Sequence, residues 1–520
     1  MMEQLLSTAL VGMRSTTQLL AASWPATLFT ALVGWIIGGY LYRSIRRPNP
    51  SEPPMVNYWI PFIGSMVSFG MNPVQFLQKN REIYGDYYTF LMFGRRMTYC
   101  LGVDGNNAFF NARLADANAE EAYASLTVPV FGEGVVYDVP NHMLMDQKRF
   151  AKGGLTADAF RLYVPIIVKE VEDYFARWHE PSGVGNIHEA MAQCIVNTAT
   201  HCLMGREIRA MMDDTVAQLY EDMDKGFTPL NFLFPSLPLP AYRRRDRAHA
   251  KMSALFQSII DARRASTDAP PDDMMTALMN SHYKDGRRMS DKEVGNLMIA
   301  LLMAGQHTSS ATTTWAILYL ADRPALVEAL REEQRKCLGD DLATPIAYEH
   351  LRDMRLLDAV VRETLRLRPP IVTAMRKVMR PMTVAGGKYV VPAGHYLGSS
   401  PALTQLDPTY FKEPLQFEPT RWLDNNSATA DEEETAGDQV DYGFGTIKLS
   451  GARNPYLPFG AGRHRCIGES FAYVQIKTIL ATMLRLFDLA PGPKGFPEMD
   501  FTSLVVLPAK PAQITYRRRQ

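Results

Sequence analysis

The 520-residue chain contains few cysteines and carries no excess of either charge. The five cysteines are odd in number, are scattered along the chain and include no C-x-x-C pair, which argues against a disulfide framework and against a zinc site. Lysine plus arginine equals aspartate plus glutamate at 55 each, so we expect no nucleic-acid partner. The small number of scattered cysteines favours a reducing compartment for most of the chain.

Charge is also missing near the amino end. No charged residue occurs between Ser15 and Tyr42, and the stretch from Trp24 to Tyr42 is strongly apolar. About 20 apolar residues in a helix cross a bilayer core, and the arginines that follow at once place the rest of the chain in the cytosol. The alternative, a cleaved signal peptide, lacks an A-x-A-like site. We therefore predict a membrane anchor over residues 1–45, with a single transmembrane span at about 22–42.

The remaining chain is predicted to form one domain behind a short linker. Five prolines between Arg46 and Pro61 predict a stiff hinge over residues 46–61. No second linker follows, so residues 62–520 are predicted to be the catalytic domain. The polar, acidic stretch at 424–441 is expected to be a surface insertion.

Apolar periodicity predicts a mainly α fold with a small β region. A β-hairpin is expected at 87–101, turning at Gly94–Arg95, and a second small β element at 386–397. Long helices are predicted at 163–182, 188–204, 247–265, 289–321, 346–367 and 467–487.

The stretch PFGAGRHRCIGE, residues 458–469, sets Cys466 behind two glycines and among three basic side chains. Gly460 and Gly462 permit positive φ and a close approach to a flat ligand. Cys466 directly precedes a predicted helix, whose positive end and free N–H groups stabilise a thiolate. A lone thiolate suits haem iron better than zinc or an iron–sulfur cluster. A buried structural cysteine beside a glycine-rich turn is the alternative.

The full pattern F-x-x-G-x-H-x-C-x-G resembles the cysteine loop of the cytochrome P-450 superfamily, the haem-thiolate monooxygenases. Their fold sets the haem between two long helices, and we expect the same here. The ETLR stretch agrees with this resemblance. In the family, a pair such as Glu363 and Arg366 meets an arginine of a later segment, here Arg421 of FEPTRW, and the resemblance gives all three a structural role.

The stretch LLMAGQHTSSATTTW, residues 301–315, agrees as well. Gly305 in the middle of a helix costs about 1 kcal/mol relative to alanine, which a ligand close to the backbone would explain. Thr308 can bond the carbonyl of residue 304 and open the helix locally. An ordinary packing seam of small residues is the alternative. In the family, this stretch forms the distal wall of the haem site.

Most relatives carry an acidic residue before this threonine, whereas this chain has His307. That departure, and the stretches at 122–160, 226–240 and 456–487, are similar to the fungal sterol 14α-demethylases. The resemblance covers nearly the whole chain after the hinge. It implies three successive monooxygenations of the 14α-methyl group of lanosterol or eburicol, releasing formate, in ergosterol biosynthesis.

The resemblance also implies a set of site residues. Cys466 would be the axial thiolate of haem b, Thr308 would deliver protons, and His307 would stand in for the usual acid. The residues implied to bind the cofactor are Tyr123, Tyr137, Lys148, Arg376, His464 and Gly468. The implied substrate wall comprises Tyr123, Thr127, Phe131, Tyr137, Phe227, Phe232, Met303, Ala304, Thr373, Met375 and Leu504.

Electrons must arrive from a second protein, because the chain has no flavin or nicotinamide motif. The resemblance implies an NADPH-cytochrome reductase, which we expect to dock near Arg463, Arg465 and Lys477. It further implies azole inhibitors as ligands, contact with the lipid bilayer, and a single-pass protein of the endoplasmic reticulum membrane with a cytosolic catalytic domain.

Two other classes of function remain open at this point. One is a haem-thiolate enzyme with another substrate or reaction, such as a fatty-acid hydroxylase or an isomerase that needs no reductase. The other is a haem sensor or sterol carrier without catalysis. The AGQHT stretch, together with Tyr123 and Tyr137, favours the demethylase over the first class. Thr308 weighs against the second, because a carrier needs no proton relay.

Overall fold

The computed structural model describes residues 30–31, 33–39, 41, 49–211, 214–226, 237–267, 271, 273–339, 344–423 and 451–519. Most of the predicted span at 22–42 and all of the predicted insertion at 424–441 lie outside these residues. Within the described ranges, no helix is both long enough and apolar enough to cross a bilayer.

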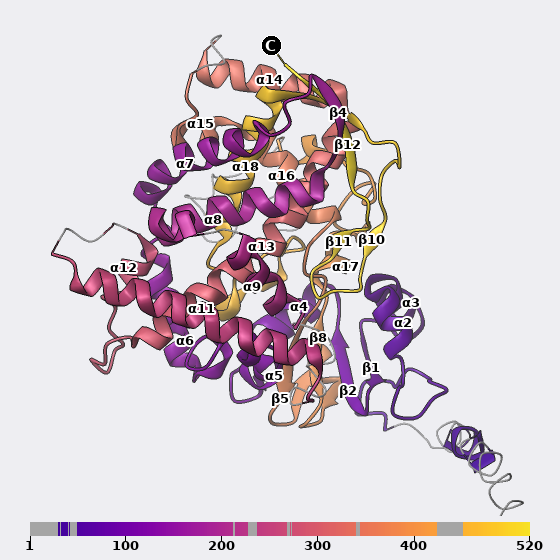
Figure 1. Cartoon of the computed structure of the whole chain (residues 1–520). Helices are drawn as coiled ribbons and strands as arrows, with labels where there is room; N and C mark the ends of the chain where they lie inside the picture. The colour runs from indigo at the N-terminus through magenta and orange to yellow at the C-terminus, as the bar shows by residue number, and fades with distance from the viewer. Residues whose placement is uncertain are drawn as a thin grey trace, which may run out of the picture.

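Helices make up most of the molecule, and the longest of them, α13, runs through its middle (Figure 1). It packs against α8, α11, α16 and α18. Ser290 begins α13 with a capping box, because its side chain accepts from the Glu293 backbone while the Glu293 carboxylate accepts from the Ser290 backbone. The long helices are α7 (Ala157–Phe175), α8 (Ile187–Met211), α11 (Pro240–Ala265), α13 (Asp291–Ala321), α16 (Arg355–Leu367) and α18 (Glu469–Leu486).

Shorter helices cover this centre and connect it to the sheets (Figure 1). They are α2 (Met66–Met71), α3 (Pro73–Tyr84), α4 (Gly102–Phe110), α5 (Glu120–Phe131), α6 (Asn141–Lys152), α9 (Asp214–Asp224), α12 (Met274–Met279), α14 (Pro324–Leu338), α15 (Tyr348–Asp353) and α17 (Pro401–Gln405).

The β structure is divided among small sheets. The largest has the order β1-β2-β8-β5-β3, in which β2 and β8 are parallel and the other neighbours antiparallel. A second sheet, β4-β12-β9, joins chain segments that lie more than 300 residues apart. The strands of these two sheets are β1 (Tyr87–Met92), β2 (Arg95–Cys100), β3 (Ala117–Asn118), β5 (Ala374–Val378), β8 (Tyr396–Ser399), β4 (Ser182–Asn186), β9 (Phe487–Pro491) and β12 (Gln513–Arg518). The two-stranded sheets pair β6 (Met382–Val384) with β7 (Tyr389–Val391), and β10 (Met499–Asp500) with β11 (Leu507–Pro508).

The mainly α fold is confirmed, and the predicted bounds of α13 and α18 lie within two residues of the observed ones. Helices α8 and α11 are present but each is seven residues longer at one end than predicted. The helix predicted at 163–182 is shifted, since α7 begins behind the Thr156 cap and the chain has entered β4 by Ser182. The helix predicted at 346–367 is two helices, α15 and α16. The Glu333 carboxylate accepts the backbone N–H groups of Leu356 and Leu357 and thereby caps a new helix start.

The predicted hairpin at 87–101 is present, with Phe93 and Gly94 in its turn. The stretch at 386–397 does not form one element. It contributes β7 to a two-stranded sheet and the first residues of β8 to the five-stranded sheet.

A fully buried ion pair lies inside α16. The Arg366 guanidinium donates two hydrogen bonds to the Glu363 carboxylate, and its remaining N–H groups reach three backbone carbonyls. Arg421 donates a further bond to the same carboxylate at 3.1 Å, and so does the Trp422 indole at 2.9 Å. The three residues Glu363, Arg366 and Arg421 therefore meet as expected, and they tie α16 to the 419–422 segment.

Candidate functional site

A cavity of about 760 Å³ lies between α13 and the loop that precedes α18. Its walls come from α5, α13, β5, the cysteine loop and the 502–507 segment, and they are mostly apolar. The pattern of burial along α13 shows which part of the helix faces the cavity. Nearly every residue of this helix is buried except Ala304–Thr308, and these five include four that line the cavity. The volume is that of a pocket for a drug-sized or cofactor-sized ligand.

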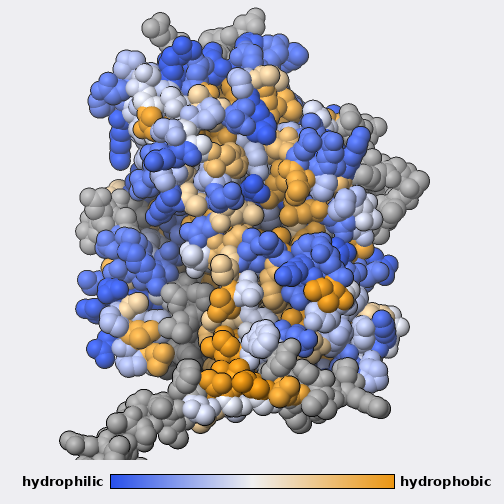
Figure 2. Space-filling model, turned by 90° about the vertical axis from the view of Figure 1, so that its right-hand side faces the viewer, coloured by the Kyte–Doolittle hydropathy of each residue, from blue (hydrophilic) through white to orange (hydrophobic). Residues whose placement is uncertain are grey.

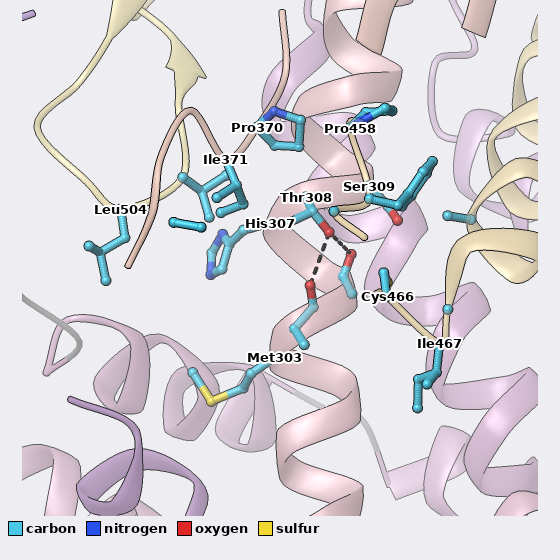
Figure 3. A pocket seen from close by; sticks show the side chains of 18 of the residues that line it. Met303, His307, Thr308, Ser309, Pro370, Ile371, Pro458, Cys466, Ile467 and Leu504 are labelled. Carbon is cyan, nitrogen blue, oxygen red and sulfur yellow. Dashed lines mark hydrogen bonds between the residues drawn. The ribbon is translucent and has the colours of Figure 1, made fainter. Parts of the chain in front are cut away.

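Cys466 faces this cavity from the loop, opposite α13 (Figure 3). All five cysteines are described, and Cys466 alone among them lines the cavity. Its backbone N–H donates to the Phe459 carbonyl at 3.0 Å, which closes the loop. Gly462, at φ +64°, is required on steric grounds, since an added Cβ would lie 3.0 Å from the Phe110 carbonyl oxygen.

The Cys466 sulfur is accessible from the cavity but lies deep in the molecule, and burial raises the pKa of its thiol. The Gly468 N–H, which bonds the sulfur, and the charges of Lys148 and Arg465 act in the opposite direction. The expected thiolate stabilisation by the helix start is therefore present, but burial outweighs it. A coordinated metal ion deprotonates such a thiol outright. Among the described residues, no group of three or more His, Cys, Asp or Glu side chains could hold a metal ion, so one sulfur is the ligand that the cavity offers.

One end of the cavity is lined by buried cationic and hydroxyl groups. Arg376 is 2% exposed, and no described carboxylate forms an ion pair with it. Burial, with the neighbouring Arg463, lowers the pKa of its guanidinium to about 10. Burial and then Arg376 lower the pKa of His464 to about 3. The rings of Tyr123 and Tyr137 stack at 5.2 Å beside them, and burial raises the pKa of both phenols.

This end of the cavity fits the two carboxylates of a haem. Arg376 donates to the Phe110 and Ala112 carbonyls but has no paired carboxylate among the described residues, and a propionate group would supply that counter-ion. Tyr123 accepts a hydrogen bond from the Met375 N–H at 3.0 Å, which fixes its hydroxyl at the end of β5. The sulfur at one wall, and the guanidinium, imidazole and phenol groups at the other, thus match the donor set that haem requires.

Lys148 does not line the cavity. Its ammonium donates to the Arg463 carbonyl at 2.9 Å and to the Arg465 carbonyl at 2.7 Å, so it joins α6 to the cysteine loop. Lys148 thus supports the loop, and its predicted contact with the cofactor stays a prediction. Lys477 also differs from expectation, because it is buried and pairs with Asp358 at 3.3 Å. It cannot belong to a docking surface.

On α13, the Thr308 hydroxyl donates to the Ala304 carbonyl at 3.0 Å (Figure 3). This is the predicted back-bond, but α13 stays a continuous helix from Asp291 to Ala321 and is not opened. Gly305 lines the cavity, and an added Cβ would meet no atom within 4 Å. Packing within the protein does not require this glycine, and an added Cβ would instead occupy open space.

His307 lies beside a carboxylate that sequence reasoning missed. Its Nε2 is 2.8 Å from Oδ1 of Asp224 at the end of α9, close enough for an ion pair although outside hydrogen-bond geometry. Both side chains are partly exposed, and both residues line the cavity. No local motif links the two, because Asp224 precedes His307 by more than 80 residues.

Most of the predicted substrate wall lines the cavity, namely Tyr123, Phe131, Tyr137, Met303, Ala304, Thr373, Met375 and Leu504. Thr127 is buried but does not line it, and its hydroxyl bonds the Tyr123 carbonyl at 3.1 Å. Phe227 and Phe232 lie outside the described residues. Ile371, which sequence reasoning did not single out, lines the cavity and is 44% exposed.

Comparisons with known proteins agree with this geometry. Residues 53–516 match the family model described as Cytochrome P450. The chain is 47% identical over 481 residues to a lanosterol 14-alpha demethylase of Cunninghamella elegans, covering 92% of this chain and 94% of that protein. It is 44% identical to the lanosterol 14-alpha demethylase erg11 of Schizosaccharomyces pombe, covering 96% and 100%.

A protein named eburicol 14-alpha-demethylase, from Uncinula necator, is 46% identical and covers 91% of each chain. Among solved structures, the retinoic acid bound cyanobacterial CYP120A1 is similar with a TM-score of 0.75 at 20% identity. That match covers 91% of this chain and 100% of the other, and it shows a common fold.

Proposed function

We propose that the chain, which belongs to the cytochrome P450 family, is a haem-thiolate sterol 14α-demethylase. It removes the 14α-methyl group of lanosterol or eburicol as formate in three successive monooxygenations, in ergosterol biosynthesis. The observation that carries this proposal is the meeting of Cys466, His307 and Thr308 at one apolar cavity. Relatives named for this reaction match more than nine-tenths of the chain.

Haem supplies the activation of dioxygen when it is bound, and the protein positions it. Cys466 is the proposed axial ligand. Arg376, His464, Tyr123 and Tyr137 are proposed to hold the propionates, and each hydrogen bond to a charged group is worth about 1.5–3 kcal/mol. Gly468 contributes its N–H to the sulfur. Lys148 holds the loop in place from α6.

The sterol is proposed to bind between α13 and β5. Met303 and Ala304 line one side of the cavity, while Thr373 and Met375 line another. An apolar cavity of this size buries a rigid four-ring lipid and excludes water from the reacting carbon. Azole inhibitors are proposed to occupy the same cavity.

Protons are proposed to reach the reaction through His307 and Thr308. Asp224 lies 2.8 Å from His307 Nε2, and both residues line the cavity, so the pair is proposed as the start of the proton path. The carboxylate faces the imidazole, and the imidazole is proposed to pass protons toward the cavity. Thr308, the next residue, holds its hydroxyl at the cavity wall through its bond to Ala304.

Electrons are proposed to come from an NADPH-cytochrome reductase. Arg463 and Arg465 are exposed on the loop that carries Cys466. Glu469 pairs with Arg465 at 2.8 Å, so Arg463 is the main positive charge that this loop offers an acidic partner. This proposed docking surface omits Lys477.

The protein is proposed to be a single-pass protein of the endoplasmic reticulum membrane, with its catalytic domain in the cytosol. Figure 2 shows apolar side chains gathered at the lower edge of one face. Helix α2 and the segment that leads into it contribute exposed apolar residues, namely Trp59, Ile60, Phe62, Val67 and Met71. Such a patch favours contact with lipid.

The proposed function is tested with the purified chain, a flavin reductase, NADPH and oxygen. Lanosterol and eburicol are expected to shift the haem from low spin to high spin, and turnover is expected to release formate. Sterol binding without formate would contradict a demethylase and favour a carrier. A spin shift with a fatty acid but not with either sterol would favour a hydroxylase of the same family.

A further inference from the structure

An exposed stripe of cations runs along the first half of α11. Arg243, Arg244, Arg247 and Lys251 are all exposed. At about 100° per residue, they fall within about 100° of the helix circumference. They therefore present one continuous positive surface, which we call the α11 stripe.

Within the described part of the chain, no carboxylate forms an ion pair with the α11 stripe. Asp246 is the one carboxylate between Pro240 and Ser253, and Arg245 binds it through both Nε and Nη2 at 2.8 Å. Among the described residues, no other carboxylate lies within ion-pair distance of the four cations. Exposed cations elsewhere often do have such partners, as Lys169 has Asp173 and Arg335 has Glu328.

The position of these cations is also unfavourable within the helix. Arg243 and Arg244 stand near the positive end of the α11 dipole, and the first turn holds no acidic residue. Neighbours at i, i+4 along the stripe repel one another. A local conflict of this kind, on an exposed surface, is what a binding site for an external anionic partner produces.

The surroundings favour a lipid surface over an acidic protein. Leu237, just before α11, is exposed, so an apolar side chain lies beside the cations in the chain. An apolar end followed by a basic helix face is the pattern of membrane-surface binding. Figure 1 shows the first turns of α11 at the lower right of the molecule, toward the corner where α2 and the N-terminal segment lie.

We propose that the α11 stripe binds the anionic headgroups of lipids in the bilayer that holds the anchor. This inference rests on the proposed membrane localisation and adds a lipid class to it. Each exposed arginine or lysine near an anionic bilayer changes the binding constant by roughly five-fold. The attraction is screened when the Debye length falls from about 8 Å to about 3 Å between 0.15 M and 1 M salt.

The test uses the full chain in nanodiscs of phosphatidylcholine, with or without phosphatidylserine, and measures amide hydrogen exchange. With phosphatidylserine, the amides of residues 237–251 are expected to exchange at least about ten-fold more slowly, and 1 M salt is expected to abolish the difference. The variant R243Q/R244Q/R247Q/K251Q is expected to show no difference between the two lipids.

A charge-matched control carries the substitutions K169Q, R177Q, R335Q and K336Q on or near α7 and α14, at the opposite end of the molecule in Figure 1. It is expected to keep the protection by phosphatidylserine. The proposal would be overturned if the unmodified chain exchanged equally fast in both lipids. It would also be overturned if the stripe variant and the control variant lost the protection by phosphatidylserine to the same extent. The carbon monoxide spectrum checks that each variant is folded, and formate release in detergent tests the proposed reaction. The lipid result therefore stands even if no formate is released.

Discussion

Arg366 and Glu363 form a two-bond ion pair in which neither side chain has any exposed surface. The five N–H groups of the guanidinium all have acceptors, and the carboxylate also accepts from Arg421, Trp422 and the Glu418 backbone. Desolvation of two charges is offset only when their hydrogen bonds are complete, as they are here. The pair therefore connects α16 with the segment around Trp422.

Glu363→Gln is expected to destabilise the fold strongly, because it leaves Arg366 buried without a counter-charge. Breaking one partner of such a pair costs about 3–5 kcal/mol. Urea unfolding of the variant should show this loss, whereas Glu332→Gln, at an exposed i, i+3 pair with Arg335, should not change the midpoint. Equal midpoints for the two variants would contradict the structural role of Glu363.

Cys466→Ala is expected to abolish the thiolate signature of the reduced carbon monoxide spectrum. The substitution removes the cysteine that lines the cavity. Cys337→Ala, at a cysteine on the outer side of α14, is the control and should leave the band unchanged. An unaltered band in the Cys466 variant would refute the ligand assignment.

Asp224→Asn is expected to slow formate release at least about ten-fold while the sterol dissociation constant stays the same. The change removes the charge beside His307 and leaves the shape of the side chain. The solvent deuterium isotope effect on turnover should increase as well, which loss of a structural contact alone would not produce. Asp222→Asn, two residues earlier on α9, is the control. Parallel losses of sterol binding and turnover would argue against a proton role.

Gly305→Ala is expected to weaken sterol or haem binding without harming the fold. Alanine improves helix stability by up to about 1 kcal/mol, and the added Cβ meets no protein atom. The methyl group instead enters the cavity. The measurements are the midpoint of unfolding and the optical titration with lanosterol. Gly295→Ala serves as the comparison. A Cβ added there would lie 3.3 Å from Phe256 Cβ, so that the substitution is limited by packing within the protein. Unchanged ligand affinity would show that the cavity does not need this glycine.

His395→Asn is expected to make stability less dependent on pH. Burial, and then Arg96, lower the pKa of His395 to about 4. Below the ordinary value near 6.5, the unfolded chain takes up a proton that the folded chain refuses, so stability falls as pH falls. Between pH 6.5 and pH 5 this loss amounts to about 2 kcal/mol. Urea unfolding at both pH values should show a smaller loss in the variant. His282→Gln, at an exposed position, should keep the full slope.

The parts of the fold that sequence could predict are those with strong local signals. α13 and α18 have long apolar patterns and defined starts, so their observed bounds lie within two residues of the predicted ones. The β4-β12-β9 sheet has no such signal, because β4 reads Ser-Gly-Val-Gly-Asn and its partner strand lies more than 300 residues away. The split between α15 and α16 depends on the distant Glu333.

The same distinction applies to the site. Cys466, His307 and Thr308 lie in compact motifs, and the structure brings them to one cavity. Asp224 and Ile371 have no motif, and only tertiary contacts reveal them. The buried position of Lys477 also depends on how α18 packs against α16, which a cationic residue in a sequence does not disclose. The balanced charge of the whole chain likewise conceals the α11 stripe.

The cavity is built from segments that lie far apart in the chain. Tyr123 and Cys466, which both line it, are separated by 343 positions, and β12 pairs with β4, which was synthesised far earlier. The pigment can therefore be enclosed only after these distant segments have met. A polypeptide that lacks residues 502–507 keeps the ligand cysteine but loses one wall of the chamber.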